Sequence, residues 1–433
     1  MENLTLAMVV AAFAVFIFLA GGLWIGLAVG AAGMLLYIFF IDGGGFYPIA
    51  ILQFNVLNSI IWTSMPLFIF MGIMIFKCGL GDKLYKFASA SVGILPGGLL
   101  HTNIVSCAIF AACTGSSLAC AATMGSIAIP ELKKRGYDKR LVLGSLASAG
   151  TLGIMIPPSV SFIVYGAVVG ESIGKLFIAG IFPGLMLVGL FMIYVAVASI
   201  ISPEKTPGKE RFNLKAFLVG FWQFMPVGLL IVMVLSAIYL GIATPTESAA
   251  LGSVGAIILA AIYGKLTWEN FSQSVIDTAV STGMIFLCVI GCQIMGMALA
   301  DLKIPATIAQ FVAGIGLGKG SIFVGIVIMY LILGCFIDAL SMVLLTLPVT
   351  YPLMMDLGFN SLWFGVLVTL LCEIGQVTPP VGMNLFVIQG ISKEKLSDVV
   401  AGSYPFVILM IVGVALLYYF PQIATWLPAQ MSR

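Results

Sequence analysis

Two long apolar runs are each interrupted by a pair of adjacent prolines. Pro157-Pro158 lies within residues 141–169, and Pro379-Pro380 lies within residues 362–389. Proline removes a backbone donor and pushes the residue before it out of the helical region. A helix that runs into either pair must therefore break. Each break frees main-chain carbonyl oxygens, which are hard ligands suited to a small cation.

A second set of candidate ligands lies at the centres of two other apolar stretches. Residues 98–130 have Gly115-Ser116-Ser117 near their centre, and residues 320–352 have Asp338 to Ser341 there. The apolar segment on each side of the centre is about 15 residues long, shorter than the roughly 20 residues of a spanning helix. Each stretch is therefore predicted to be a re-entrant hairpin. One hairpin tip and one helix break would together make one cation cage.

Asp338 is the strongest single candidate for a functional residue. A carboxylate at the centre of a membrane helix costs about 2.5–3.5 kcal/mol on insertion scales, so it is rare without a function. It could bind a cation, carry a proton or accept a hydrogen bond from a substrate. The structural alternative is a capped hairpin turn, because Asp favours such positions. For the serines at the first tip, the alternative is packing or a bond to the preceding helical turn.

Three further polar residues lie close to the breaks. Ser161 follows the first double proline and Asn384 follows the second, where Asn384 can point at the same cavity as Thr378. Both are candidate substrate donors. Glu373, one turn before the second break, could be a ligand or could bond to an opposed helix.

The composition indicates a polytopic membrane protein of the all-α class. Of the 433 residues, 61% are hydrophobic and 8% are charged, against about 25% charged residues in soluble chains. A net charge of +2 gives no indication of a nucleic-acid partner. The Gly-x-x-x-x-Gly-Lys-Ser/Thr motif does not occur, so no ATP binding is expected. The eight cysteines match no zinc pattern.

The chain contains an internal repeat. A shift of 222 residues places Pro157-Pro158 on Pro379-Pro380 and Ser116 on Asp338 without a gap. The loop 131–140 has five basic residues and its counterpart 353–362 has none, whereas the next pair of loops reverses the bias. Short basic loops stay in the cytoplasm, so the two copies are predicted to lie in opposite orientations. Inverted repeats with broken helices are typical of secondary transporters.

We therefore predict two inverted-topology repeats, each with about five spans and one hairpin. The first covers residues 1–201 and the second covers residues 216–433. A polar, basic and hence cytoplasmic linker, residues 202–215, joins them. Both termini are then expected on the outer side of the membrane.

Several motifs resemble those of one transporter family, the large membrane subunit of tripartite ATP-independent periplasmic (TRAP) transporters. They spread over most of the chain and are specific only together: Cys113-Thr114-Gly115-Ser116-Ser117, Pro130-Glu131-Leu132 with Arg135-Gly136-Tyr137, Ile156-Pro157-Pro158-Ser159, Thr244-Pro245-Thr246-Glu247, Phe336-Ile337-Asp338 and Thr378-Pro379-Pro380-Val381-Gly382-Met383-Asn384.

The resemblance implies an elevator-type fold, with a scaffold domain and a transport domain that carries both hairpins. It implies sodium-driven import of an organic acid, such as a C4-dicarboxylate, a sialic acid or a small sulfonate, across the bacterial inner membrane, with both termini periplasmic. It also implies two partners, a separate small membrane subunit of four helices and a periplasmic substrate-binding protein.

The resemblance further implies two sodium sites at the hairpin tips and helix breaks. Their residues would be Gly115, Ser116, Ser117, Ile156, Pro157 and Ser159 in the first copy, and Asp338, Ser341, Gly375, Thr378, Pro379 and Gly382 in the second. Ser116, Ser161 and Asp338 would be neighbours of the substrate.

Three other functions are considered. A stand-alone sodium–carboxylate symporter of the same superfamily, which needs no binding protein, stays an alternative. An enzyme is disfavoured because no nucleophile–base constellation occurs. A channel is disfavoured because the sequence has no ring of like charges.

Overall fold

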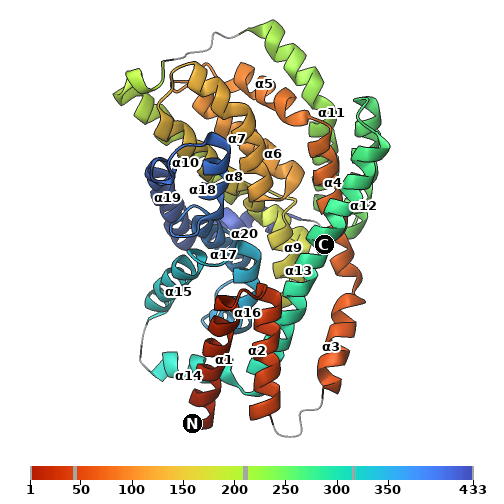
Figure 1. Cartoon of the computed structure of the whole chain (residues 1–433), viewed down its shortest axis with the longest axis vertical. Coiled ribbons are helices and arrows are strands. Elements are labelled where there is room, and N and C mark those ends of the chain that lie inside the picture. The colour runs from red at the N-terminus through yellow and green to blue at the C-terminus, as the bar shows by residue number, and fades with distance from the viewer. Residues whose placement is uncertain (1, 42–45, 208–212, 315, 317, 432–433) are drawn as a thin grey trace.

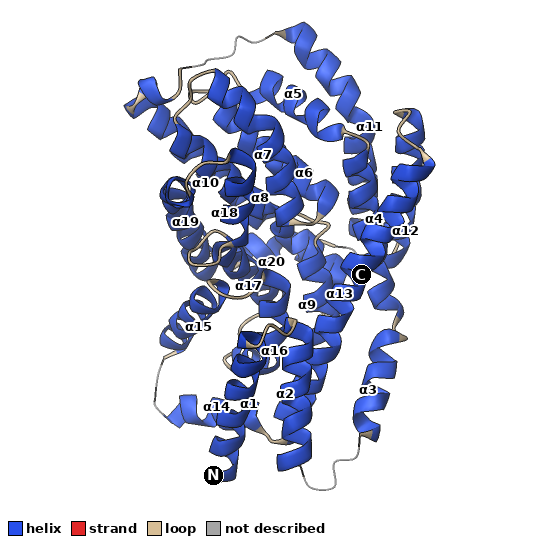
Figure 2. Cartoon of the chain, viewed as in Figure 1, coloured by secondary structure: helices blue, strands red, loops and turns tan. Residues whose placement is uncertain are grey.

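The computed structural model describes residues 2–41, 46–207, 213–314, 316 and 318–431. These residues form α-helices and short 3-10 helices, with no strand among them (Figure 2). The α-helices are α1 (Glu2–Ala20), α2 (Ile25–Phe40), α3 (Tyr47–Leu57), α4 (Ser64–Lys77), α5 (Leu80–Val92), α6 (Leu99–Thr114), α7 (Ser117–Lys134), α8 (Lys139–Met155), α9 (Val160–Val169), α10 (Ile173–Ile201), α11 (Leu214–Tyr239), α12 (Pro245–Ile262), α13 (Trp268–Asp301), α14 (Ile304–Gly314), α15 (Lys319–Gly334), α16 (Ala339–Asp356), α17 (Ser361–Gln376), α18 (Met383–Ser392), α19 (Leu396–Tyr419) and α20 (Gln422–Ala429).

The all-α polytopic class predicted from the composition is confirmed. Within the described residues, eight helical segments are long and apolar enough to cross a membrane. The molecule is elongated, with α1 and α14 towards one end of its long axis and α5 towards the other (Figure 1). Residues 208–212 of the predicted linker lie outside the described part of the chain.

Helix pairs occupy both predicted hairpins. In the first, α6 and α7 turn at Gly115 and Ser116, and in the second, α15 and α16 turn at residues 335–338. The first pair lies towards the end of the molecule that carries α5, and the second towards the end that carries α14 (Figure 1). Whether the pairs re-enter a membrane from opposite sides stays a prediction.

Both double prolines lie between two helices. Residues 156–159 separate α8 from α9, and residues 377–382 separate α17 from α18. The sequence therefore placed both helix breaks correctly, for the reason that proline cannot continue a helical hydrogen-bond ladder.

The two broken helices run antiparallel to each other. The Tyr165 hydroxyl near the end of α9 donates a hydrogen bond of 2.8 Å to the carbonyl of Ser361 at the start of α17. At the other end, Lys139 at the start of α8 lies 3.2 Å from Glu394, which follows α18. The end of each broken helix is thus beside the start of the other.

Small residues allow two helix pairs to approach closely. Along α2, Gly26, Gly30 and Gly33 face α13, and a Cβ atom at Gly26 would lie 2.6 Å from the Leu287 carbonyl oxygen. Between α8 and α19, Gly144 and Gly402 meet so closely that a Cβ on either would overlap the opposing main chain. Such contacts drive helix association in lipid, where apolar side chains gain little by leaving the hydrocarbon.

The contact between α8 and α19 gives a first prediction. Gly144→Ala should destabilise the protein by about 1–3 kcal/mol, because the added methyl group has no room. As a matched control, Gly189→Ala in α10 should be neutral or slightly stabilising, since no heavy atom of the described residues lies within 4 Å of a Cβ there. Thermal unfolding of both variants in detergent checks this, and equal melting temperatures would contradict it.

A cluster of ion pairs ties the start of α8 to the α18–α19 connection. We call it the end clasp, and it consists of Lys133, Lys139, Arg140, Glu394 and Asp398. Lys139 lies 2.7 Å from Asp398 and 3.2 Å from Glu394, and Arg140 lies 3.2 Å from Asp398. Hydrogen bonds from Lys139 and Lys133 lower the pKa of the Glu394 carboxyl.

The lowered pKa of Glu394 gives a prediction for the pH dependence of stability. A depressed carboxyl pKa stabilises the fold above the unfolded-state value of about 4.3, and this stabilisation is lost as the pH falls through the folded-state pKa. Glu394→Gln should therefore flatten the decline in melting temperature below about pH 5 relative to wild type. The effect should be small and sensitive to salt, because the pairs are exposed. A parallel decline in wild type and Glu394→Gln would contradict it.

Candidate functional site

The first hairpin tip is seated on the first helix break. Gly115 ends α6 with a positive φ of 59°, and a Cβ atom there would lie 2.8 Å from the Pro158 carbonyl oxygen. A Cβ atom at Gly153, just before the break, would lie 2.6 Å from the carbonyl group of Ser116. Glycine is needed at both positions, so the tip and the break touch through their main chains.

The serines of the first cage are each fixed by a hydrogen bond. Ser117 Oγ donates to the Thr151 carbonyl at 3.2 Å, and Ser159 Oγ donates to the Ile154 carbonyl. Ser116 Oγ caps α7 by accepting the Ala119 N–H at 3.4 Å. Ser117 and Ser159 donate, so both lone pairs of each hydroxyl oxygen stay open, whereas Ser116 uses one of its two lone pairs as an acceptor.

The second hairpin tip meets the second break in the same way. The Val381 N–H donates a 3.0 Å hydrogen bond to the Cys335 carbonyl, which joins the break to the tip. Gly334 and Gly375 approach so closely that a Cβ on Gly375 would lie 2.6 Å from Gly334 Cα. Within the break, Thr378 accepts the Gly382 N–H at 3.2 Å through its carbonyl. Both predicted pairings of tip and break are therefore present.

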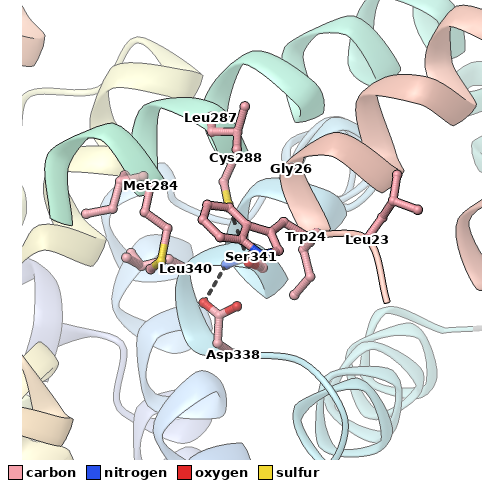
Figure 3. A pocket seen from close by; sticks show the side chains of 11 residues that line it. Leu23, Trp24, Gly26, Met284, Leu287, Cys288, Asp338, Leu340 and Ser341 are labelled. Carbon is pink, nitrogen blue, oxygen red and sulfur yellow. Dashed lines mark hydrogen bonds between the residues drawn. The ribbon is translucent and has the colours of Figure 1, made fainter. Parts of the chain in front are cut away.

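Asp338 both caps a helix and lines a cavity. Its carboxylate accepts the Ser341 N–H at 3.1 Å, which is the capped turn considered as the structural alternative. The same side chain lines a cavity of about 290 Å³, formed with residues of α2 and α13 (Figure 3). A carboxylate has about four acceptor positions, so one hydrogen bond leaves most of its capacity open.

Ser161 and Asn384 lie away from that cavity. Both are fully buried, and neither is among the residues that line it. Asn384 Nδ2 donates to the Ala147 carbonyl of α8 at 3.2 Å, whereas its Oδ1 and the Ser161 Oγ have no partner among the described residues. Asn384 thus contacts the other broken helix. Of the residues predicted to lie beside the substrate, Asp338 lines this cavity.

Glu373 lies where the two broken helices meet. It is fully buried in α17 and approaches the backbone of Met155, at the end of α8. Neither carboxylate oxygen completes a hydrogen bond of good geometry within the described residues. A buried acid with open acceptor positions lies within two residues of the predicted ligand Gly375.

The sequence analysis did not identify the residues that line the side of the cavity facing the hairpin tip. Trp24 at the start of α2, with Met284 and Cys288 of α13, lines this side (Figure 3). The Cys288 Sγ lies 4.0 Å from Ser341 Oγ. These residues are apolar members of apolar runs, so their types and spacing give no signal of a site.

Ser159 and Ser161 give a matched pair for a test. Ser159→Ala should lower stability by about 0.5–1.5 kcal/mol, because it removes a buried hydrogen bond. Ser161→Ala should change stability by less than about 0.5 kcal/mol, because its hydroxyl makes no bond within the described structure. Thermal unfolding in detergent distinguishes the two, and an equal loss would show that Ser161 is also bonded.

Comparisons with known proteins agree with this architecture. A family model described as "Tripartite ATP-independent periplasmic transporter, DctM component" matches residues 12–423. The chain is similar to the isethionate TRAP transporter permease protein DctMQ of Oleidesulfovibrio alaskensis, with 34% identity over 94% of this chain and 64% of that protein. It thus spans under two thirds of that relative's length.

Two further relatives carry other substrate names. The C4-dicarboxylate TRAP transporter large permease protein DctM of Pseudomonas aeruginosa is 32% identical over 88% of this chain and 89% of its own length. The sialic acid TRAP transporter permease protein SiaT of Haemophilus influenzae is 32% identical over 86% of this chain and 60% of its own length.

A solved structure shows the same fold. The crystal structure of the Alcanivorax borkumensis YdaH transporter superposes with a TM-score of 0.61, covering 93% of this chain and 96% of that one. The identity is 12%, so this likeness concerns the fold alone.

Proposed function

Because this chain belongs to the family of DctM components of tripartite ATP-independent periplasmic transporters, we propose that it is the membrane subunit of a sodium-coupled importer of an organic acid. The relatives are named for isethionate, C4-dicarboxylates and sialic acid. They share an acidic group, a sulfonate or a carboxylate, and we extend that class to the substrate of this chain.

One observation carries the sodium proposal. In each half, a hairpin tip is seated on a helix break, through Gly115 and Pro158 in the first and through Cys335 and Val381 in the second. Broken helices leave carbonyl oxygens without helical partners, and carbonyl and hydroxyl oxygens suit a small hard cation. The first site would use oxygens of residues 115–117 and 156–159, and the second those of Asp338, Ser341 and residues 375–382.

Alternating access would follow from the arrangement of the broken helices. Their antiparallel course, seen in the contacts of Lys139 with Glu394 and of Tyr165 with Ser361, supports an inverted repeat with its sites between the two halves. We propose that the hairpins and broken helices move as one elevator-type transport domain against a scaffold that includes α2 and α13.

The partners and location follow from the family. We propose a separate small membrane subunit of four helices, a periplasmic substrate-binding protein, a place in the bacterial inner membrane and periplasmic termini. Sodium-driven uptake by this chain without any partner would favour the alternative, a stand-alone symporter.

Removal of the Asp338 charge tests the proposal. Asp338→Ser should lower sodium-driven uptake of the organic acid at least tenfold, because it removes a ligand while serine still caps α16. The measurement uses proteoliposomes that contain the complete transporter, with an inward sodium gradient. Asp356→Ser, an exposed acid at the other end of α16, is the control and should transport as wild type does. Unchanged uptake by Asp338→Ser, at equal protein stability, would contradict the proposal.

A further inference from the structure

A group of lysines lies beside the start of α5 and takes no part in the proposed sodium sites. Lys77 ends α4, Lys83 lies in the first turn of α5, and Lys265 lies in the connection between α12 and α13. Lys77 forms an ion pair of 2.9 Å with Asp277 of α13. Lys83 and Lys265, which we call the lysine pair, form no ion pair within the described residues. Their two charges are therefore uncompensated.

The two members of the lysine pair converge on one place. The Lys83 Nζ lies 3.9 Å from the centre of the Tyr263 ring, and Tyr263 precedes Lys265 by two residues. Two residues of chain span at most about 7 Å, so the backbone of Lys265 lies close to the Lys83 ammonium group. Burial raises the pKa of the Cys78 thiol, and the charges of Lys83 and Lys265 counteract part of this rise. Both charges thus act on one point at the end of α4.

The surrounding structure holds the lysine pair in place without using its donors. The face of an aromatic ring attracts a cation, and the Tyr263 hydroxyl donates a 2.7 Å hydrogen bond to the Gln223 carbonyl of α11. The backbone of Lys265 is fixed by a 2.9 Å hydrogen bond from Asn270 Nδ2 to its carbonyl. Each ammonium group has three N–H donors. The lysine pair therefore presents several positioned donors to an anion.

The surface next to the lysine pair is apolar. Trp268, three residues after Lys265, is 80% exposed, and Ile262 and Leu266 are exposed as well. Exposed tryptophan beside lysine is typical of the boundary between hydrocarbon and headgroups in a membrane. Basic sites between helices at this depth bind anionic headgroups. A phosphate group that carries acyl chains matches both the charge and the apolar surface, whereas a soluble anion matches the charge alone.

The acidic residues near the lysine pair limit its capacity. Asp82 precedes Lys83 in α5, and Glu269 follows Lys265 in the first turn of α13. Both carboxylates are exposed, and neither forms an ion pair within the described residues. They repel a second anion, so the site suits one headgroup.

We propose that the lysine pair binds the phosphate of one anionic phospholipid, such as phosphatidylglycerol, whose acyl chains cover the surface around Trp268. The phosphate then joins α5 to the α12–α13 connection. Helix α5 packs on α11 through Phe87 and Phe217, whose rings lie 5.7 Å apart (Figure 1). It also contacts α6 of the first hairpin through the Tyr85 hydroxyl, which donates a 3.1 Å hydrogen bond to Asn103. The lipid thus fixes the helix that lies between α11 and the first hairpin, independently of sodium or substrate.

Lipid titration of the purified full chain in detergent, followed by native mass spectrometry, tests the proposal. Wild type should bind phosphatidylglycerol at least tenfold tighter than phosphatidylcholine. Each lysine near an anionic headgroup contributes roughly fivefold in affinity. Lys83→Gln combined with Lys265→Gln should therefore weaken phosphatidylglycerol at least tenfold and leave phosphatidylcholine unchanged. Lys83→Arg combined with Lys265→Arg keeps both charges and should bind as wild type does.

The matched control removes two exposed lysines from other helices. Lys175→Gln in α10 combined with Lys319→Gln in α15 should bind phosphatidylglycerol as wild type does. Equal binding of the two lipids by wild type, unchanged binding in the glutamine variant of the lysine pair, or the same loss in its arginine variant or in the control would overturn the proposal. Displacement of phosphatidylglycerol by inorganic phosphate in large excess would assign the lysine pair to a soluble anion and would overturn it as well.

Discussion

Main-chain groups that lose their helical partners in a medium without water must find other partners, and this constraint shapes the centre of the molecule. At the two double prolines the helical ladder stops, and each gap is covered by the tip of a hairpin. The Val381 N–H finds the Cys335 carbonyl, and Gly115 brings its backbone against Pro158. The arrangement that covers the breaks is also the one that we propose for cation binding, because carbonyls without helical partners need both a shield from lipid and a partner.

The close approach of backbones explains why glycine recurs at these contacts. A Cβ atom at Gly153 or Gly375 would lie 2.6 Å from the main chain of the hairpin tip, so the tip would have to move away from its break. Glycine also allows close backbone contact away from the breaks, where Gly26 meets α13 and Gly144 meets Gly402. In lipid the association of helices depends on packing more than on the hydrophobic effect, so small residues decide which helices pair. The end clasp adds ion pairs at an exposed end of the molecule. Water screens these pairs, so each contributes little to stability, but their charges lose little hydration.

Features set by local chemistry could be predicted, and features set by distant contacts could not. Prolines fixed both helix breaks, and Gly115 and Asp338 marked both hairpin turns, because each acts on its own stretch of backbone. The position of Asn384 just after the second double proline predicted that it can point at the same cavity as Thr378, but it could not reveal that Asn384 reaches Ala147 of α8. Trp24 and Cys288 line the cavity through tertiary packing alone, so no pattern in their own apolar runs indicated them.

The two hairpin tips differ in charge, although the side chain at each tip caps a helix in the same way. Ser116 and Asp338 occupy equivalent positions in the repeat, and each caps its helix by accepting the N–H three residues ahead, at 3.4 Å and 3.1 Å. Serine and aspartate cap helices about equally well, so capping requires a polar side chain at both positions but not a charge at either. Asp338 is half-buried among apolar residues, and a charge there has a solvation cost that a hydroxyl avoids. The charge of Asp338, rather than its presence at a turn, is therefore the property that capping does not require and for which the proposed sodium site offers a reason.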